Sequence, residues 1–333
     1  MESSFESALE QPRAGGPELL RLVQRPLRAP GRGQLRVRIL AAGVGATDLM
    51  VMAGRYGFAP KPPVVPGYEV AGVVEAVGEG VTGWVPGQRA AALTVHGGFA
   101  HAIVRDAGEF APIPDAVTDV DAAAVILNHV SAWQMVHRVA RVRPGDTALV
   151  TAAGGGVGTA LLQQLRLAGA RTFGAASRGR HALVEALGAV PLDRHAGTVD
   201  NLVRQAVPGG VDHAFDGVGF ASIDACVRAS KRGGRVVGFG FMGGGGGAAT
   251  ALMFGRLFGG ALLHGRRPSF YGITLRYRRD PAPFHDDLAQ VFGQLERRLI
   301  APLVDAVLPL AEGPTALARL AAGQVRGKLV LIP

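Results

Sequence analysis

The residues best suited to chemistry form a glycine-rich turn, Thr151-Ala152-Ala153-Gly154-Gly155-Gly156-Val157-Gly158. Its small residues would let the backbone approach a pyrophosphate, and a helix starting near Val157 would point free N–H groups and its positive dipole end at that anion. The spacing is Ala153-x-Gly155-x-x-Gly158, with alanine in place of the first glycine of the dinucleotide pattern. We therefore expect a dinucleotide site, and the alternative is an ordinary glycine-rich strand-to-helix turn. The predicted contacts come from Ala153, Gly155, Gly156, Val157 and Gly158.

The residues after the next predicted strand indicate which dinucleotide binds. NAD sites place an Asp or Glu about 20 residues beyond the glycines, where it holds the ribose 2′-hydroxyl. This chain has Ser177, Arg178 and Arg180 there, and the next acid is Glu185, inside a predicted helix. A hydroxyl and two guanidinium groups suit a 2′-phosphate, because arginine offers planar, charged donors. The pattern favours NADPH, and the alternative is that both arginines are merely solvated.

The elements that must position these residues alternate along the middle of the chain. From about Asp121, helical patterns and short apolar runs follow one another, which is typical of a doubly wound parallel sheet. The predicted strands are Thr147 to Ala153, Arg171 to Ala176, Ala189 to Leu192, Val211 to Phe215 and Gly234 to Gly240. The predicted helices are Ala122 to Val142, Val157 to Leu167, His181 to Leu187, Val199 to Ala206 and Ser222 to Ala229.

The two ends of the chain do not show this regular alternation of strands and helices. The first 120 residues contain short strands broken by glycine and proline, at Gln34 to Ala42, Val70 to Val77, Gln88 to Leu93 and Phe99 to Val104. We interpret the run Gly243 to Gly247 as a mobile loop or spacer. A strand (Pro268 to Ile273), a helix (Pro283 to Arg298) and a last strand (Lys328 to Ile332) are expected after it. Because 333 residues exceed one usual hydrophobic core, we expect two domains, with the chain's end rejoining the first.

Composition and charge narrow the classes of function. The formal charge of +9 raises nucleic acid as a partner, but the basic residues are scattered and lack a recognisable nucleic-acid motif, so none is expected. No stretch of about 18 uncharged apolar residues occurs, which predicts a soluble, cytoplasmic protein without a membrane partner. Cys226 is the only cysteine, which excludes an internal disulfide and a multi-cysteine metal site. We expect it to be a small buried side chain.

Motifs along nearly the whole chain resemble the zinc-independent quinone oxidoreductase and enoyl reductase branch of the medium-chain dehydrogenase/reductases. They are AAGVGATD at 41–48, VPGYEVAGVV at 65–74, GGFA at 97–100, SAW at 131–133, the glycine turn, VDHAFDGVG at 211–219, GGRVV at 233–237 and RGKLVL at 326–331. The resemblance implies an α/β protein with a GroES-like, mainly β catalytic domain (1–124 and 274–333) and a Rossmann domain with a doubly wound parallel sheet (125–273). It also implies a homodimer that pairs around Pro268 to Ile273, and it adds Gly240 and Lys328 to the cofactor-binding residues.

The resemblance also indicates whether this chain has the ligands of a catalytic zinc ion. Zinc-dependent relatives hold their catalytic metal with a Cys, a His and a further Cys, and this chain has Gly45, Tyr68 and approximately Leu127 at the matching positions. None of these is a plausible zinc ligand, so no metal is expected. Without a Lewis acid, alcohol dehydrogenation is disfavoured. The remaining chemistry is hydride delivery to an electron-poor carbon of an enone, an enoyl thioester or a quinone.

Two further residues are candidates for catalysis. Tyr56 falls where enoyl-thioester reductases of this branch carry a tyrosine that helps protonate the product enolate, and a phenol of pKa about 10 can donate at neutral pH. The alternative for Tyr56 is packing or contact with the nicotinamide. Quinone reductases often have Asn at the position of Gly45, and Asn128 is the candidate for that polar role; the alternative is a helix-surface amide.

These features predict an NADPH-dependent, zinc-independent oxidoreductase that acts on a small-molecule substrate. The alternative from another class is an NADPH-binding sensor or assembly protein without redox turnover.

Overall fold

The structure, a computed structural model, describes residues 5–240 and 247–333, and the chain divides into two compact units. Unit 1 comprises the residues up to Val130 together with Thr274–Pro333, and unit 2 comprises Ser131–Ile273. The predicted loop Gly243 to Gly247 lies outside the described residues except for Gly247, at which a helix begins. Within the two described ranges, no helix combines the length and the hydropathy needed to cross a bilayer.

Unit 1 contains a seven-stranded, mainly antiparallel sheet that joins the two ends of the chain. Strand β15 (Lys328–Ile332) pairs in parallel with β14 (Val304–Pro309) and antiparallel with β3 (Gln34–Val44). The sheet continues through β4 (Glu69–Val77), β5 (Arg89–Ala92) and β7 (Phe110–Pro112), and β6 (Ala102–Asp106) also pairs with β3. β1 (Phe5–Glu10) and β2 (Arg21–Pro26) form a separate antiparallel pair. The last strand of the chain therefore lies inside the sheet of the first unit.

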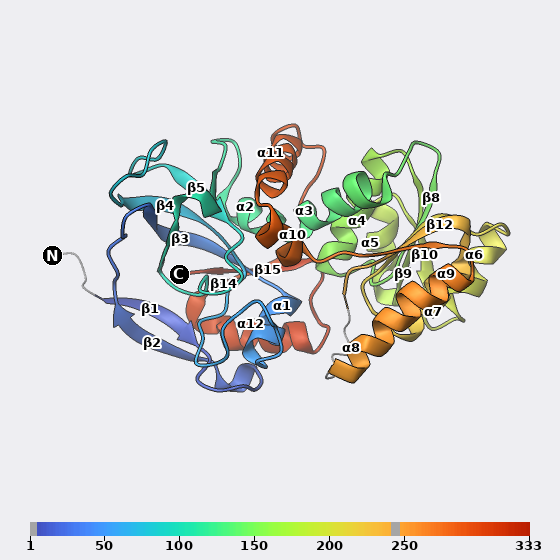
Figure 1. The fold of residues 1–333 in the computed structure, drawn as a ribbon, viewed down its shortest axis with the longest axis horizontal. Helices are drawn as coiled ribbons and strands as arrows, with labels where there is room; N and C mark the ends of the chain where they lie inside the picture. The colour runs from blue at the N-terminus through green and yellow to red at the C-terminus, as the bar shows by residue number, and fades with distance from the viewer. Residues whose placement is uncertain (1–4, 241–246) are drawn as a thin grey trace. The chain divides into compact units, whose positions relative to one another are not determined.

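Unit 2 contains a six-stranded parallel sheet with helices packed against it (Figure 1). In spatial order the strands are β10 (Val190–Asp193), β9 (Arg171–Ala176), β8 (Thr147–Val150), β11 (Val211–Asp216), β12 (Ser230–Gly238) and β13 (Arg267–Phe270). Successive strands extend to one side of β8 and then, from β11 onward, to its other side. A mixed GroES-like sheet and a doubly wound parallel sheet confirm the predicted fold class.

The helices have the following bounds. Those of unit 1 are η1 (Pro17–Leu19), α1 (Ala46–Met52), η2 (Ala107–Glu109), α2 (Asp119–Val125), α10 (Ile273–Arg279), α11 (Ala282–Glu296), η6 (Leu310–Glu312) and α12 (Gly313–Ala321). Helix α3 (Asn128–Trp133) spans the boundary between the units. The helices of unit 2 are the π-helical η3 (Gln134–Ala140), α4 (Gly156–Leu167), η4 (Arg178–Arg180), α5 (His181–Ala186), α6 (Val199–Ala206), α7 (Ala221–Ala229), α8 (Gly247–Phe254), the π-helical η5 (Gly255–Gly260) and α9 (Ala261–Leu263). Helix α4 contacts β8 and β9, and α7 contacts β11 and β12.

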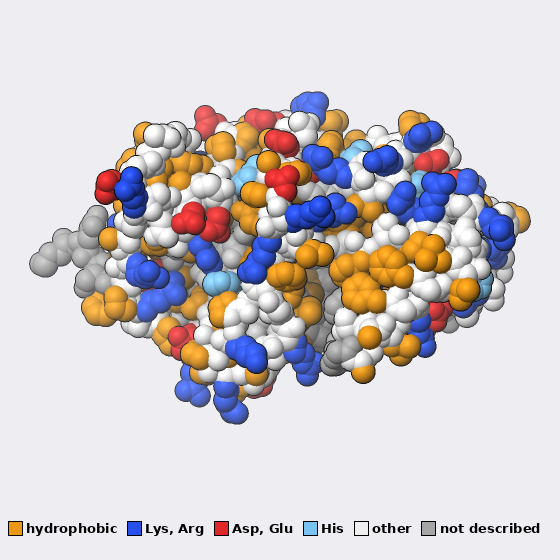
Figure 2. All heavy atoms as spheres, viewed as in Figure 1, with side chains coloured by type: hydrophobic (Ala, Val, Ile, Leu, Met, Phe, Trp, Pro, Cys, Tyr) orange, Lys and Arg blue, Asp and Glu red, His pale blue; other side chains and the backbone are white. Residues whose placement is uncertain are grey.

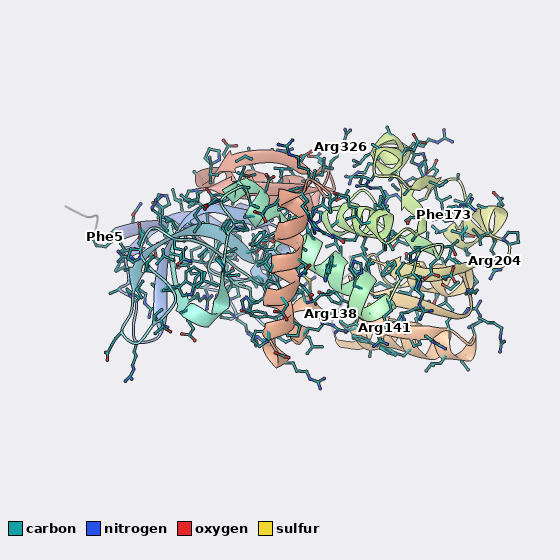
Figure 3. All side chains as sticks on the ribbon, turned by 90° about the horizontal axis from the view of Figure 1, so that it is seen from above. Phe5, Arg138, Arg141, Phe173, Arg204 and Arg326 are labelled. Atoms are coloured by element: carbon teal, nitrogen blue, oxygen red, sulfur yellow. The ribbon has the colours of Figure 1, made fainter. Side chains whose placement is uncertain are left out.

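Each unit has its own hydrophobic core, as expected of separate domains. The core of unit 1 includes Leu35, Val74 and Phe99, and that of unit 2 includes Phe173 and Leu257. Phe173, on β9, lies among the packed elements of unit 2 (Figure 3) and is fully buried. Because full burial of such a side chain contributes about 1.5–3 kcal/mol, these cores are the main source of stability in each unit.

Several predicted elements differ from the structure. The strands predicted at Gly234 to Gly240 and Phe99 to Val104 are β12 (Ser230–Gly238) and β6 (Ala102–Asp106). The helix predicted from Ala122 to Val142 is divided into α2, α3 and η3. The backbone N–H of Leu127 donates to the Glu69 carboxylate at 2.6 Å, which takes it out of the helical pattern; the continuous apolar sequence carries no sign of this. The predicted strand Pro268 to Ile273 ends at Phe270, because Ile273 already begins α10. The strand predicted to reach Ala153 ends at Val150, and the glycine turn begins there.

Candidate functional site

The glycine turn of unit 2 lies at the carboxyl end of β8, beside β11. These strands are neighbours in the sheet but far apart in the sequence, and open α/β sheets bind ligands where the strand order reverses in this way. Helix α4 begins directly after the turn, with Gly155 at its N-cap and no side chain capping its first N–H groups. Such a helix end suits an anion. A Cβ at Gly158 would lie 2.2 Å from the carbonyl oxygen of Ala152, so this position requires glycine.

The three residues predicted to select NADPH follow β9 at the same edge of the sheet. The Arg180 guanidinium donates to the carbonyl oxygen of Gly154 at 2.7 Å, so it lies against the glycine turn. Arg178 is exposed and forms an ion pair with Asp193, with Nε 2.8 Å from Oδ2. Ser177 is partly exposed at the end of β9. All three residues thus follow β9 directly, and their contact with a 2′-phosphate stays a prediction. Sequence reasoning missed Asp193, which ends the neighbouring strand β10.

A buried carboxylate connects the glycine turn with the turn after β11. Asp216 accepts hydrogen bonds from Thr151 Oγ1 at 2.7 Å, Ser222 Oγ at 2.5 Å and the backbone N–H of Gly219 at 2.7 Å. The Thr151 hydroxyl oxygen accepts from the N–H of Gly217 at 3.1 Å, so the two turns are held together. The sequence motif VDHAFDGVG contained this aspartate but did not indicate its partners.

Gly240 and Cys226 are two further residues of unit 2 for which the sequence makes a prediction. Gly240 follows β12, and a Cβ there would lie 2.8 Å from the carbonyl oxygen of Gly217, so it packs against the turn after β11. Cys226 is fully buried, as predicted, and burial together with the nearby Asp216 carboxylate raises the pKa of its thiol well above the usual range. Cys226 is therefore unsuited to nucleophilic chemistry.

In unit 1, Tyr56 belongs to a cluster of three hydroxyl groups. Its Oη lies 2.7 Å from Oη of Tyr68 and 2.7 Å from Oγ1 of Thr274, and the last two hydroxyls also contact each other. Tyr68 and Thr274 are buried, whereas Tyr56 is partly exposed. Burial raises the pKa of Tyr56 and raises that of Tyr68 well above the usual range, so both phenols are protonated at neutral pH. Sequence reasoning missed Thr274.

Arg278, on α10, fixes the segment that carries Tyr56. Its guanidinium donates to the carbonyl oxygen of Phe58 at 2.6 Å and lies 5.2 Å from the centre of the Phe58 ring. The rings of Phe58 and Tyr56 meet edge to face, with centroids 5.5 Å apart. Tyr56 is therefore held from two sides, by the hydroxyl cluster and by Phe58.

The three positions that correspond to zinc ligands in related enzymes meet in unit 1. Tyr68 immediately precedes Glu69, whose carboxylate accepts from the N–H of Leu127. A Cβ at Gly45 would lie 3.5 Å from the Leu127 side chain and 3.7 Å from the Lys328 ammonium nitrogen. In the two described ranges, no three His, Cys, Asp or Glu side chains are grouped so that they could hold a metal ion. The site therefore presents a glycine, a phenol and a hydrocarbon side chain.

A buried charged group lies beside this position. Lys328, predicted from the resemblance to bind the cofactor, forms an ion pair with Glu69, and both side chains are buried. Asp48 accepts from the backbone N–H of Gly45 at 2.8 Å and of Gly67 at 3.0 Å. Burial raises the pKa of Asp48 to about 7.

Asn128, the second predicted catalytic residue, begins α3 and is 6% exposed. The alternative of a helix-surface amide is therefore wrong. The neighbouring His129 is also buried, and burial lowers its pKa to about 4, so its ring is neutral. Its Nδ1 has no hydrogen-bond partner in the part of the chain that the structure describes.

Two family models match the chain. The model described as "Alcohol dehydrogenase GroES-like domain" matches residues 31–115, and the one described as "Zinc-binding dehydrogenase" matches residues 187–331.

Similar proteins cover almost the whole chain. It is 30% identical over 339 residues to the synaptic vesicle membrane protein VAT-1 homolog of Mus musculus, covering 96% of this chain and 82% of that protein. Among solved structures, a mycobacterial protein complexed with NADPH has 30% sequence identity and a TM-score of 0.88, covering 98% of this chain and 100% of the other. A Pseudomonas syringae quinone oxidoreductase has 27% identity and a TM-score of 0.89 with the same coverage.

The chain also resembles part of a much larger enzyme. It is 31% identical over 310 residues to the phthioceranic/hydroxyphthioceranic acid synthase of Mycobacterium bovis, covering 91% of this chain but 14% of the synthase.

Proposed function

Because the chain belongs to the medium-chain dehydrogenase/reductase superfamily, in its zinc-independent branch, it is an oxidoreductase of that type, and we propose that it uses NADPH to reduce an activated C=C bond or a quinone. The activated bond would be that of an enone or an enoyl thioester. The two kinds of acceptor share one property, which is that their own conjugation takes up the charge when hydride arrives.

The observation that carries this proposal is the set of side chains at the three positions where related enzymes bind zinc. Gly45 has no side chain, Leu127 offers only hydrocarbon, and the Tyr68 phenol is protonated at neutral pH because burial raises its pKa. These groups do not form a zinc-binding set, so a zinc ion at this position would lack the ligands that hold it as a Lewis acid in related enzymes. A substrate that is already electron-poor does not need one.

The residues of unit 2 support NADPH as the cofactor. The uncapped N-terminus of α4 and the small residues of the turn, Ala153 to Gly158, would hold the pyrophosphate. Arg180, whose guanidinium contacts the turn, and the exposed Arg178 would supply charged donors to the 2′-phosphate, with Ser177 beside them. Gly240 and Lys328 stay predicted cofactor contacts. A similar protein of known structure is complexed with NADPH, which agrees with this choice.

The protein's own part in the reaction would be to orient the substrate and to supply a proton. The reduced nicotinamide provides a hydride when it is bound. Hydride addition to an enone leaves an enolate, and Tyr56 is the proposed proton donor because its phenol is both protonated and partly exposed. Asn128 is proposed as a further polar group in the site.

The test uses the purified full chain with NADPH, and with NADH in parallel. An enone, an enoyl thioester and a quinone are added in turn, and the nicotinamide absorbance is followed. We expect oxidation of NADPH in preference to NADH with at least one acceptor. Replacing Tyr56→Phe should lower the rate with an enone by about 100-fold, because general acid catalysis contributes about 10²- to 10⁴-fold.

Tyr277→Phe is the matched control for Tyr56→Phe. Tyr277 also lies in unit 1, but its ring packs edge to face on Phe284 and it is not part of the hydroxyl cluster. The Tyr277→Phe variant should reduce the enone at the wild-type rate. If NADPH binds tightly but no acceptor in the panel oxidises it, the oxidoreductase proposal fails and the sensor or assembly role is favoured.

A further inference from the structure

We propose that Tyr68 and Thr274 are positioning residues for Tyr56, which hold its hydroxyl in place and stabilise the phenolate left when Tyr56 gives up its proton. This inference rests on the proposed function, in which Tyr56 is the proton donor.

Each of the three hydroxyls in the cluster contacts the other two. Tyr56 follows α1, Tyr68 directly precedes β4, and Thr274 is the second residue of α10. The Tyr56 hydroxyl lies 2.7 Å from each of the other two, and those two contact each other. In residues 5–240 and 247–333, none of the three hydroxyls forms a hydrogen bond to any other group. The three hydroxyls therefore form hydrogen bonds only with one another in the described residues.

Counting hydrogens shows what such a cluster can do. Three hydroxyls contribute three hydrogens, and each oxygen can both donate and accept. When Tyr56 protonates an enolate, a C–H bond forms on the substrate, the Tyr56 O–H bond breaks, and its electron pair stays on the phenolate oxygen. Two hydrogens then remain, on Tyr68 and Thr274, and both can point at that oxygen. Hydrogen bonds to an ionised acceptor are stronger than those between neutral groups.

Burial determines how Tyr56 regains its proton. Tyr68 and Thr274 are each 1% exposed, and in the described residues their hydroxyls contact only each other and Tyr56, so their hydrogen-bonded route to water passes through Tyr56. Tyr56 is partly exposed, so water at its own exposed face returns the proton. Tyr68 keeps its hydrogen throughout, because burial raises its pKa well above the usual range. The cluster is thus a stabiliser of the phenolate and not a relay.

The charged and titratable groups around Tyr56 are compatible with this role. Burial is the largest influence and raises the pKa of Tyr56, while hydrogen bonds from Thr274 and Tyr68 lower it. The Arg278 guanidinium lowers the pKa further, and the Asp48 carboxylate raises it. Removing either neighbouring hydroxyl should therefore make Tyr56 harder to ionise.

The decisive experiment measures the ionisation of Tyr56 without turnover. The full chain has four tyrosines, so ¹³Cζ-tyrosine NMR gives four signals, each assigned by a Tyr→Phe variant. We expect Tyr68→Phe and Thr274→Val each to raise the pKa of Tyr56 by about one unit, a tenfold change in its ionisation. Thr274→Ser keeps the hydroxyl and should keep the original pKa. Tyr277→Phe should also leave it unchanged.

The result that overturns the proposal is an unchanged Tyr56 pKa in Tyr68→Phe and Thr274→Val, since a cluster with only a packing role would alter stability and leave ionisation alone. If Tyr68→Phe fails to fold, the difference in the Tyr56 pKa between Thr274→Val and Thr274→Ser still tests the proposal.

A kinetic measurement separates this inference from the proposed function. On an enone that the wild type reduces, Tyr68→Phe and Thr274→Val should lower kcat by about tenfold with little change in KM, and Thr274→Ser should restore it. Equal kcat values in all of these proteins would contradict the positioning role while the oxidoreductase proposal stands. If the wild type oxidises no NADPH, the proposed function fails, and the NMR titration still decides whether the two hydroxyls stabilise the phenolate.

Discussion

Asp48 is the residue whose ionisation should affect the stability of unit 1 most clearly. It is fully buried, and its two hydrogen bonds from Gly45 and Gly67 fix the start of α1 and the turn before Tyr68. Those bonds and the Lys328 ammonium favour the carboxylate, but burial outweighs them and raises the pKa from 3.8 to about 7. The folded state therefore favours the neutral acid more than the unfolded chain does.

A pH dependence of stability follows from Asp48. Because its folded-state pKa is raised, its contribution is fully present below the unfolded value of 3.8 and is lost as pH rises through about 7. Replacing Asp48→Asn should flatten the fall in the free energy of unfolding between these values, measured by urea unfolding at several pH values. Asp280→Asn, at an exposed carboxylate, is the control. A slope equal to that of the wild type in Asp48→Asn would contradict the assignment.

Among the elements, the turn between β8 and α4 depends most strongly on glycine. A Cβ at Gly158 would lie 2.2 Å from a backbone oxygen and 2.9 Å from the backbone of Ala153, so the helix would have to move away from the turn. At Gly155 the nearest atom would be 3.3 Å away, which a small shift relieves. Gly155 therefore tolerates a larger side chain better than Gly158 does, although both belong to one motif.

Replacing Gly158→Ala should lower the free energy of unfolding by about 1–3 kcal/mol, the usual effect of overpacking. Gly155→Ala should cost less than about 1 kcal/mol, because alanine is only a poorer N-cap than glycine. Chemical denaturation of the full chain, followed by circular dichroism, measures both. Equal losses in the two variants would show that the close approach at Gly158 does not limit stability.

Local elements could be predicted from the sequence, and contacts between distant segments could not. β9, α6 and β15 have the predicted bounds, because their apolar patterns end at clear turn signals. The division of the helix after Ala122 escaped prediction, because its cause is a hydrogen bond from Leu127 to Glu69, 58 residues away. Local pattern carries no information about such a partner.

The same limit applies to the candidate site. The glycine turn and the residues after β9 were evident because they are contiguous in the sequence. Thr274 lies 218 residues from Tyr56, and Asp193 reaches Arg178 only because β10 pairs with β9. Their roles depend on the fold, which no short motif encodes.

At the scale of the whole molecule, we propose that two copies pair through β13. This strand ends the parallel sheet, and an open strand edge can pair with another chain. The adjoining η5 and α9 expose Phe258, Leu262 and Leu263, and Figure 2 shows hydrophobic side chains gathered over this part of unit 2. Leu263 is 87% exposed, which is unusual for a leucine in a monomer.

The pairing predicts a mass of about twice 34.4 kDa by light scattering. The double replacement of Leu262→Glu and Leu263→Glu should yield monomers, because charges at the contact would lose their water. Leu22→Glu, at an exposed leucine of β2 in unit 1, should leave the dimer intact. A monomeric wild type would disprove the pairing.

The position of β15 has a consequence for the order in which the protein is made. Ribosomal synthesis proceeds from the N-terminus, so β3 and β4 emerge early, yet β3 receives β15 as a neighbour only after residues 328–332 have been made. Until then Glu69 lacks its Lys328 counter-ion. Thr274, the third hydroxyl of the Tyr56 cluster, is made earlier than β15 but still after β13, the last strand of unit 2. Unit 2 is one continuous stretch and has all of its strands by then. The nascent chain thus contains a complete set of nucleotide-domain strands before the hydroxyl cluster can exist.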